Sequence, residues 1–134
     1  KSKLITSFAA GFSGNILYVH ERDSYAILKS TDGGVNWTSF SNNSPNGVLA
    51  VSPNDSNRII FSNLNSLYLS TDGLASSSLV LSGVIDSFDS IVFAPSNANI
   101  IYAITRRYSF YKSADGGSTF NLLVNFRTNK IIND

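Results

Sequence analysis

The sequence predicts an all-β protein built from about three four-stranded antiparallel units, and two observations support this prediction. A Ser-x-Asp-x-Gly-like pattern recurs three times along the chain, with its serines 40 and 43 residues apart, at Ser30, Ser70 and Ser113. Short apolar segments of strand length recur with the same period, separated by Gly, Asn, Ser and Pro. No stretch shows helical periodicity. Four strands in about 40–45 residues is the size of one blade of a β-propeller.

Each unit is expected to contain four strands in the same order. The first strands are expected at residues 4–9, 48–51 and 90–93. The second strands are near-continuous apolar runs, as expected for strands buried on both faces, at residues 16–19, 59–61 and 100–104. The third strands alternate and end at the recurring serine, at residues 25–29, 67–69 and 110–112. The fourth strands are clearest at residues 79–81 and 122–124.

These strands divide the chain into blades within one domain, residues 1–134. The first blade is expected at about 1–43, the second at about 44–84 and the third at about 85–128, followed by a tail at 129–134. Residues 130–132 are interpreted as the start of a fourth blade.

The recurring pattern, Ser-x-Asp-x-Gly-x-x-Trp/Phe, lies between the third and fourth strands. Its aspartate can accept backbone N–H groups across a tight turn, to which the serine adds a hydroxyl. Its glycine allows a positive φ, and its aromatic residue is expected to fold back and bury its ring. The residues in these roles are Ser30, Asp32, Gly34, Trp37, Ser70, Asp72, Ser113, Asp115, Gly117 and Phe120.

The middle copy departs from the pattern, because Leu74 replaces the glycine and Ser77 replaces the aromatic residue. We therefore expect a looser turn there. In the first copy, burial of the ring predicts that Trp37→Ala costs about 3–5 kcal/mol.

These motifs resemble the Asp-box, or sialidase-type, repeat family, and the resemblance covers nearly the whole chain. Sialidases, sortilin-like receptors, xyloglucan-degrading glycosidases and photosystem assembly factors carry such repeats. The resemblance implies a β-propeller. It implies little about activity, because the box is structural in most of the family.

Three blades make an open arc, because a propeller typically has at least about four. The terminal blades would then expose apolar faces and strand edges. We expect a homo-oligomer, in which two copies form a six-bladed ring with two-fold symmetry, or a larger chain that supplies the other blades. A non-propeller sandwich is the third alternative.

The composition excludes several classes of function. The net charge is +1 and no basic stripe is present, which gives no reason to expect a nucleic-acid partner. No apolar run is long enough for a membrane span. The sequence has no cysteine and one histidine, and each box has a single carboxylate, so we expect no metal and no cofactor. Abundant Ser and Asn, with no methionine at position 1, suggest an exported protein, extracellular or at the cell surface, or a piece of a longer chain.

Catalytic residues are not expected. The resemblance to sialidases implies an arginine triad, a tyrosine nucleophile with a glutamate beside it, and an aspartate acid. The only glutamate, Glu21, has no matching tyrosine, and residues 126–129 lack the Ile-Pro of the family's Arg-containing segment. A two-carboxylate glycosidase would have Asp86 and Asp89 as its best candidates, since they precede a first strand that would line the central channel.

Two charged segments between second and third strands are candidate ligand-binding loops. One contains Arg106, Arg107 and Tyr108, where two guanidinium groups beside a ring could hold an anion or a sugar. The other contains Glu21 and Arg22. The sequence thus favours a non-catalytic module that binds a protein or a glycan, or that drives assembly. The alternatives are a fragment of a glycoside hydrolase propeller and a structural surface or filament subunit.

Overall fold

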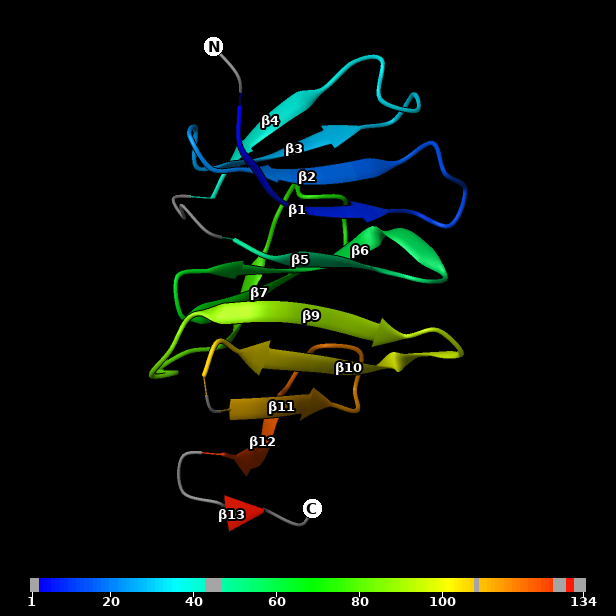
Figure 1. Ribbon diagram of the computed structural model, residues 1–134. Helices are drawn as coiled ribbons and strands as arrows, with labels where there is room; N and C mark the ends of the chain where they lie inside the picture. The colour runs from blue at the N-terminus through cyan, green and yellow to red at the C-terminus, as the bar shows by residue number, and fades with distance from the viewer. Residues whose placement is uncertain (1–2, 43–46, 108, 127–129, 132–134) are drawn as a thin grey trace.

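The computed structural model describes residues 3–42, 47–107, 109–126 and 130–131, and in these residues the chain forms strands and no helix (Figure 1). Blade 1 comprises β1 (Ile5–Ala10), β2 (Leu17–Glu21), β3 (Ala26–Ser30) and β4 (Thr38–Ser41). Blade 2 comprises β5 (Leu49–Ser52), β6 (Asp55–Asn63), β7 (Ser66–Ser70) and β8 (Ser78–Leu81). Blade 3 comprises β9 (Phe88–Ala94), β10 (Asn97–Thr105), β11 (Ser109–Ser113), β12 (Asn121–Asn125) and β13 (Lys130–Ile131).

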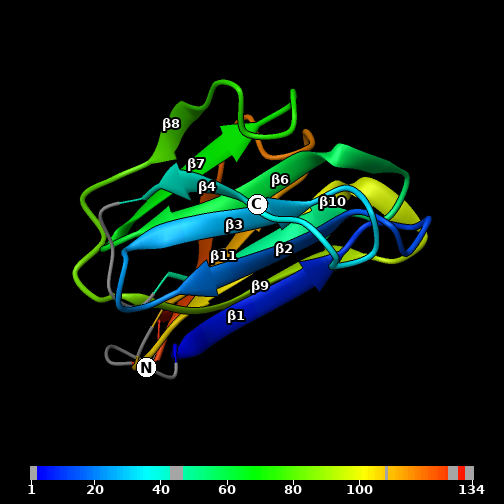
Figure 2. The same cartoon turned by 90° about the horizontal axis from the view of Figure 1, so that it is seen from above.

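Each blade is one antiparallel sheet whose strands pair in sequence order, so the predicted all-β class with three antiparallel blades is confirmed. The blades follow one another from the N-terminus to the C-terminus, and β1, β5 and β9 are neighbours along one side of the arc (Figures 1 and 2). The described part of the chain contains no helix that could serve as a membrane span.

The blades share one register, which allows positions to be compared between them. The box serine ends the third strand of each blade, where it faces a residue of the second strand in the pairs Leu17–Ser30, Ile59–Ser70 and Ile101–Ser113. Counting from these pairs gives equivalent positions in every blade.

The interpretation of residues 130–132 as the start of a fourth blade is wrong. Lys130 pairs with Asn125 and Ile131 with Val124, so β13 is a fifth strand of blade 3. An outer strand has unpaired backbone groups along its free edge, and β13 satisfies part of that edge on β12. Ile132 lies outside the described residues.

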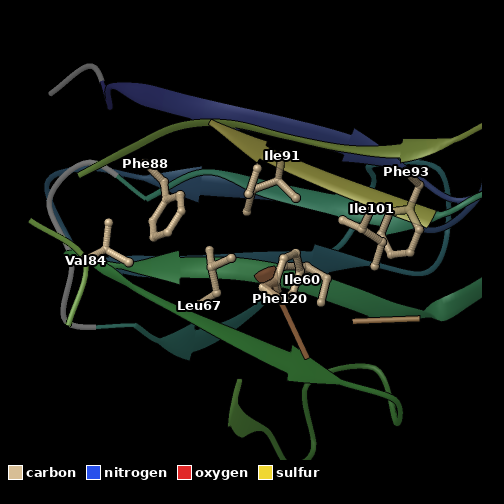
Figure 3. Packing of buried hydrophobic residues seen from close by; sticks show 9 residues of the cluster. Ile60, Leu67, Val84, Phe88, Ile91, Phe93, Ile101 and Phe120 are labelled. Atoms are coloured by element: carbon tan, nitrogen blue, oxygen red, sulfur yellow. The ribbon is translucent and has the colours of Figure 1, made fainter. Parts of the chain in front are cut away.

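The core consists of two clusters, each between neighbouring blades. The cluster between blades 1 and 2 contains Tyr18, Ile27, Leu49, Ile59 and Phe61. The cluster between blades 2 and 3 is built around Ile60, Leu67, Phe88, Ile101 and Phe120, with other residues shown in Figure 3. Because side chains alternate along a strand, Ile59 and Ile60 of β6 point into different clusters. Blade 2 is therefore covered on both faces.

Candidate functional site

The box turns are hydrogen-bonded units between the third and fourth strands. In blade 1 the Ser30 hydroxyl donates to Asp32 Oδ1 at 2.8 Å and accepts from the Gly34 N–H at 2.8 Å. The same Oδ1 accepts from the backbone N–H of Val35 at 3.0 Å and of Asn36 at 2.9 Å. The aspartate thus closes the turn in the manner of an Asx turn.

The third box repeats this arrangement. The Ser113 hydroxyl donates to Asp115 Oδ1 at 2.8 Å and accepts from the Gly117 N–H at 2.9 Å. Thr119 donates to the same carboxylate through its backbone N–H, at 2.9 Å, and its hydroxyl, at 2.5 Å.

The expectation of a looser turn in the second box is wrong. The Leu74 N–H donates to the Ser70 hydroxyl at 2.9 Å, and Ser76 donates to both oxygens of Asp72. Leu74 adopts a φ of 78°, close to the 98° of Gly34 and the 96° of Gly117. A leucine in this region is strained, since its Cβ crowds the backbone. The side chain packs against the cluster between blades 1 and 2, which offsets that cost.

The expectation that the box aromatic residues bury their rings is correct for Phe120 and wrong for Trp37. Phe120 is 9% exposed, in the core between blades 2 and 3, whereas Trp37 is 40% exposed. The Trp37 indole does fold back, and its Nε1–H donates to the Gly34 carbonyl at 2.9 Å. The difference arises because blade 2 covers the box of blade 3, while none of the described blades packs against the box of blade 1.

These turns predict acid sensitivity. Hydrogen bonds lower the pKa of Asp32 to about 2, chiefly from the Asn36 N–H, and that of Asp115 to about 2, chiefly from the Thr119 hydroxyl. The pKa of Asp72 is lowered in the same way by Ser76. A carboxylate whose pKa is lower when folded stabilises the fold above its unfolded pKa of about 3.9. That contribution is lost as the pH falls through the folded value.

We therefore expect the melting temperature to fall steeply between about pH 4 and pH 2, measured by circular dichroism. Asp115→Asn should melt lower than wild type at pH 6 and should show a shallower fall over the same range. A wild-type melting temperature that is constant from pH 5 to pH 2 would contradict this account of the turns.

Basic side chains of the preceding blade hold the second and third boxes. Lys29 of β3 donates to the Gly73 carbonyl at 3.1 Å, and its Nζ lies 5.6 Å from the centre of the Tyr18 ring. Arg58 of β6 donates to the Gly116 carbonyl through Nε at 3.1 Å and also through Nη2. Sequence reasoning missed both residues, because Lys29 and Arg58 occupy different strands and show no periodic pattern.

The first strands show that blade 1 has an uncovered face. Phe8, Leu49 and Ile91 occupy equivalent positions, opposite Val19, Phe61 and Ala103. Leu49 is 5% exposed and Ile91 is 6% exposed, because each packs against the preceding blade, whereas Phe8 is 60% exposed. We call this uncovered side of blade 1, with Phe8 and Trp37, the N-face.

Blade 3 has an uncovered face at the other end of the arc. Its Tyr102 pairs with Lys112, as Tyr18 pairs with Lys29 in blade 1. Tyr18 is fully buried beneath blade 2, while Tyr102 and Lys112 are only half-buried and Val92 is 52% exposed. We call this side, with Val92, Tyr102, Phe110 and Lys112, the C-face.

The first predicted ligand-binding loop is only partly a loop. Glu21 lies at the end of β2 and is 1% exposed. It accepts hydrogen bonds from the Ser24 hydroxyl at 2.7 Å and from Lys3 at 3.3 Å, and these partners, Ser24 first, lower its pKa. The assignment of Glu21 as an exposed binding residue is therefore wrong, while Arg22 is exposed in the turn that follows.

The second predicted loop places Arg106 and Arg107 in the turn between β10 and β11, where both side chains are exposed. The Arg106 N–H donates to the Ser87 carbonyl at 3.0 Å, which ties this turn to the segment between blades 2 and 3. Tyr108 lies outside the described residues. The turns with Arg22 and Arg106 both connect second and third strands, so they lie at the end of the blades opposite the boxes.

The two candidate catalytic carboxylates differ in their surroundings. Asp89 is exposed on β9, whereas Asp86 is half-buried in the segment before it and accepts a hydrogen bond from the Ser87 N–H at 2.9 Å. The first strands line a groove of about 390 Å³, as expected for a propeller channel, but its walls are mainly apolar and include neither aspartate. Among the described residues, no three His, Asp or Glu side chains gather as metal ligands would.

Comparisons with known proteins place the chain among propellers. No protein-family model matches it, and no curated protein matches it. An ancestral GH74 enzyme is similar over 96% of this chain and 19% of its own, at 26% identity and a TM-score of 0.77. YCF48 bound to D1 peptide is similar over 90% of this chain and 39% of its own, at 15% identity and a TM-score of 0.68. A chain of a nidogen/laminin complex is similar over 92% of this chain and 49% of its own, at 16% identity and a TM-score of 0.72.

These structures are β-propeller-type proteins, which agrees with the three blades described above. This chain spans from about a fifth to about a half of their lengths. At sequence identities of 15–26%, the comparisons establish the fold of this chain, namely its arrangement of blades.

Proposed function

We propose that this chain is a non-catalytic assembly and binding module of the Asp-box type, and that its three blades form a ring with the blades of a second copy. The observation that carries the proposal is the match between its two uncovered faces. The C-face repeats the tyrosine–lysine pair that blade 1 presents to blade 2. The N-face presents a box turn, which is what the lysine of that pair contacts inside the chain.

The contacts across the new interface follow from those between blades 1 and 2. Lys112, equivalent to Lys29, would donate to the carbonyl of Gly33, equivalent to Gly73, in the other copy. Phe8 and Trp37 would be buried there, as Leu49 and Phe120 are buried between blades. Two arcs joined head to tail in this way close a six-bladed ring with two-fold symmetry.

The described carboxylates support a binding role over a catalytic one. The three box aspartates are occupied by turn hydrogen bonds, and the buried Glu21 accepts hydrogen bonds from Lys3 and Ser24. The binding surface we assign is the end of the ring opposite the boxes, where Arg22, Arg106 and Arg107 are exposed. A protein or a glycan is the proposed ligand.

A glycoside hydrolase fragment is the second candidate, and the similarity to the ancestral GH74 enzyme favours it. In that case Asp86 or Asp89 would contribute one of the two carboxylates that such chemistry needs. Hydrolysis of a sialoside or a glucan by this chain would contradict the non-catalytic proposal and support this second one.

The assembly is tested by measuring the mass of the chain in solution by sedimentation equilibrium. We expect a dimer. Phe8→Asp should give a monomer with an unchanged circular dichroism spectrum, because Phe8 is already 60% exposed within one arc. Phe12→Asp is the matched control, since Phe12 is 71% exposed in the turn between β1 and β2, outside the paired strands that carry Phe8, and should stay dimeric.

A wild-type monomer would overturn the proposed ring. Open polymers would also overturn it, in favour of a filament subunit whose faces join without closing.

A further inference from the structure

The fourth strand of blade 2, β8, lies at the outer margin of its sheet, beyond β7 (Figure 2). Strand β7 pairs with one edge of β8, and no other described strand pairs with its opposite edge, which we call the β8 edge. An outer strand edge presents backbone N–H and C=O groups that can pair with another extended chain.

Blade 3 shows how such an edge is covered in this chain. Its fourth strand, β12, carries the fifth strand β13, with Ile131 opposite Val124 and Lys130 opposite Asn125. Asn125, which pairs with β13, is half-buried. A fourth strand of this blade type therefore accepts an antiparallel fifth strand made of an aliphatic residue and a long polar one.

The β8 edge is equivalent to the covered edge of β12. Leu81 lies opposite Leu67, three residues before the box serine of blade 2, and Val124 lies opposite Phe110, three residues before the box serine of blade 3. Leu81 is thus equivalent to Val124. Ser82, which follows Leu81, is equivalent to Asn125 but is exposed.

The β8 edge is apolar and uncharged. Leu79 is 53% exposed, and residues 74–85 include no charged side chain and no proline. Outer strands are commonly protected from pairing by lysine, proline or other charged residues, and β8 has none of these. In blade 1 the position of Leu79 is taken by Ser39, so the outer strand β4 offers a more polar edge.

The strand is also held in place before any partner arrives. Val80 and Leu81 pack against the core between blades 2 and 3, and β7 pairs with β8 from Leu67 to Leu69. A strand that is already fixed in its extended conformation loses little conformational entropy when a further strand pairs with it.

We propose that the β8 edge is a docking site for an extended aliphatic segment of a partner protein, which adds to blade 2 as β13 adds to blade 3. Backbone hydrogen bonds supply the affinity, and alternate side chains supply the specificity. In the register of β13, an aliphatic side chain of the partner lies opposite Leu81 and a polar one opposite Ser82. Since residues 74–85 are uncharged, binding is insensitive to salt.

This surface goes beyond the proposed function. It is separate from the turns that carry Arg22, Arg106 and Arg107, and it does not depend on the ring. Fourth strands are the outermost strands of propeller blades, so the β8 edge stays accessible when the ring closes. The monomeric variant Phe8→Asp should therefore bind the partner segment as the wild type does, and the two proposals can fail separately.

The test is an NMR titration of the isotope-labelled chain with a synthetic peptide of residues 128–134, capped at both ends. The peptide contains the Lys130–Ile131 pair that binds β12, and its charges cancel. We expect saturable shifts of the β8 amides that salt does not alter. Leu79→Lys should weaken binding at least tenfold, since a lysine protects an outer edge. Leu64→Lys is the matched control, because Leu64 is 59% exposed in the turn between β6 and β7 and should leave binding unchanged.

Two further peptides test strand pairing directly, with a methyl group on the backbone nitrogen of Lys130 in one and of Ile131 in the other. Successive N–H groups of a strand point to opposite sides, so one methylated peptide should lose binding and the other should keep it.

Several results would overturn the proposal. They are no peptide binding by the wild type, shifts confined to β12, equal binding by wild type and Leu79→Lys, and the same effect from both methylated peptides. Shifts of the β8 amides on dilution of the chain alone would also overturn it, in favour of pairing between the β8 edges of two copies.

Discussion

Phe120→Ala is expected to lower the free energy of unfolding by about 3–5 kcal/mol, the largest effect of any substitution considered in this chain. The ring is 9% exposed and belongs to the core between blades 2 and 3, together with Ile60, Ile101 and Phe88. Its removal takes away buried apolar area and leaves a cavity that a sheet held by its own hydrogen bonds cannot readily close. Urea unfolding followed by circular dichroism measures the change.

Trp37→Ala is the matched control, because it removes the aromatic residue of another box. Trp37 is 40% exposed, so we expect a loss of only about 1–2 kcal/mol within one arc. Equal losses for the two variants would mean that blade 2 does not provide the difference in burial. A loss for Trp37→Ala that grows with protein concentration would show that dimerisation covers the ring.

Gly117→Ala is expected to cost about 2–4 kcal/mol, from two sources. Gly117 has a φ of 96°, which an L-residue adopts only with strain. A Cβ at this position would also meet Ile60 Cδ1 at 2.6 Å and Ile101 Cδ1 at 3.2 Å, so both core side chains must shift. The same urea unfolding experiment tests this prediction.

Gly34→Ala provides the comparison, because Gly34 has nearly the same φ, 98°, and more room. Its Cβ would lie 3.5 Å from the nearest atom, in Leu17, so backbone strain alone should remain and the cost should be about 1–2 kcal/mol. A cost for Gly117→Ala no greater than that for Gly34→Ala would exclude crowding by blade 2 as a cause.

The strands and turns of the blades could be predicted from the sequence, because the interactions that form them join residues close together in the chain. Alternating and apolar segments favour strands, and the box residues bond to one another within a few positions, as Ser30 does with Asp32 and Gly34. The predicted second strand at 59–61 was too short, since β6 begins at Asp55. Polar residues at its start still form strand, because the turn from β5 returns directly through Ser52 paired with Asp55.

Features that depend on neighbouring blades could not be predicted in the same way. Trp37 and Phe120 occupy the same motif position. Phe120 is buried because blade 2 covers it, whereas none of the described blades covers Trp37. Glu21 was expected in a loop beside Arg22, but it ends strand β2 and is 1% exposed, and its partner Lys3 is distant in the sequence. The substitution at Ser77 was visible in the sequence, whereas the pocket of about 160 Å³ that Ser77 lines also needs a wall from blade 1.

Blade 2 lies between two separate cores, so the three blades are expected to differ in how readily they unfold locally. In a linear array, the stability of each unit is the sum of its intrinsic stability and the energies of its interfaces with neighbouring units. The end units have only one such interface, so they unfold first. In a single arc, amide hydrogen exchange should be slowest in β6 and β7 and faster towards both ends, because the middle unit alone has two neighbours. In a closed ring every unit would have two neighbours, and this gradient in exchange rates would disappear.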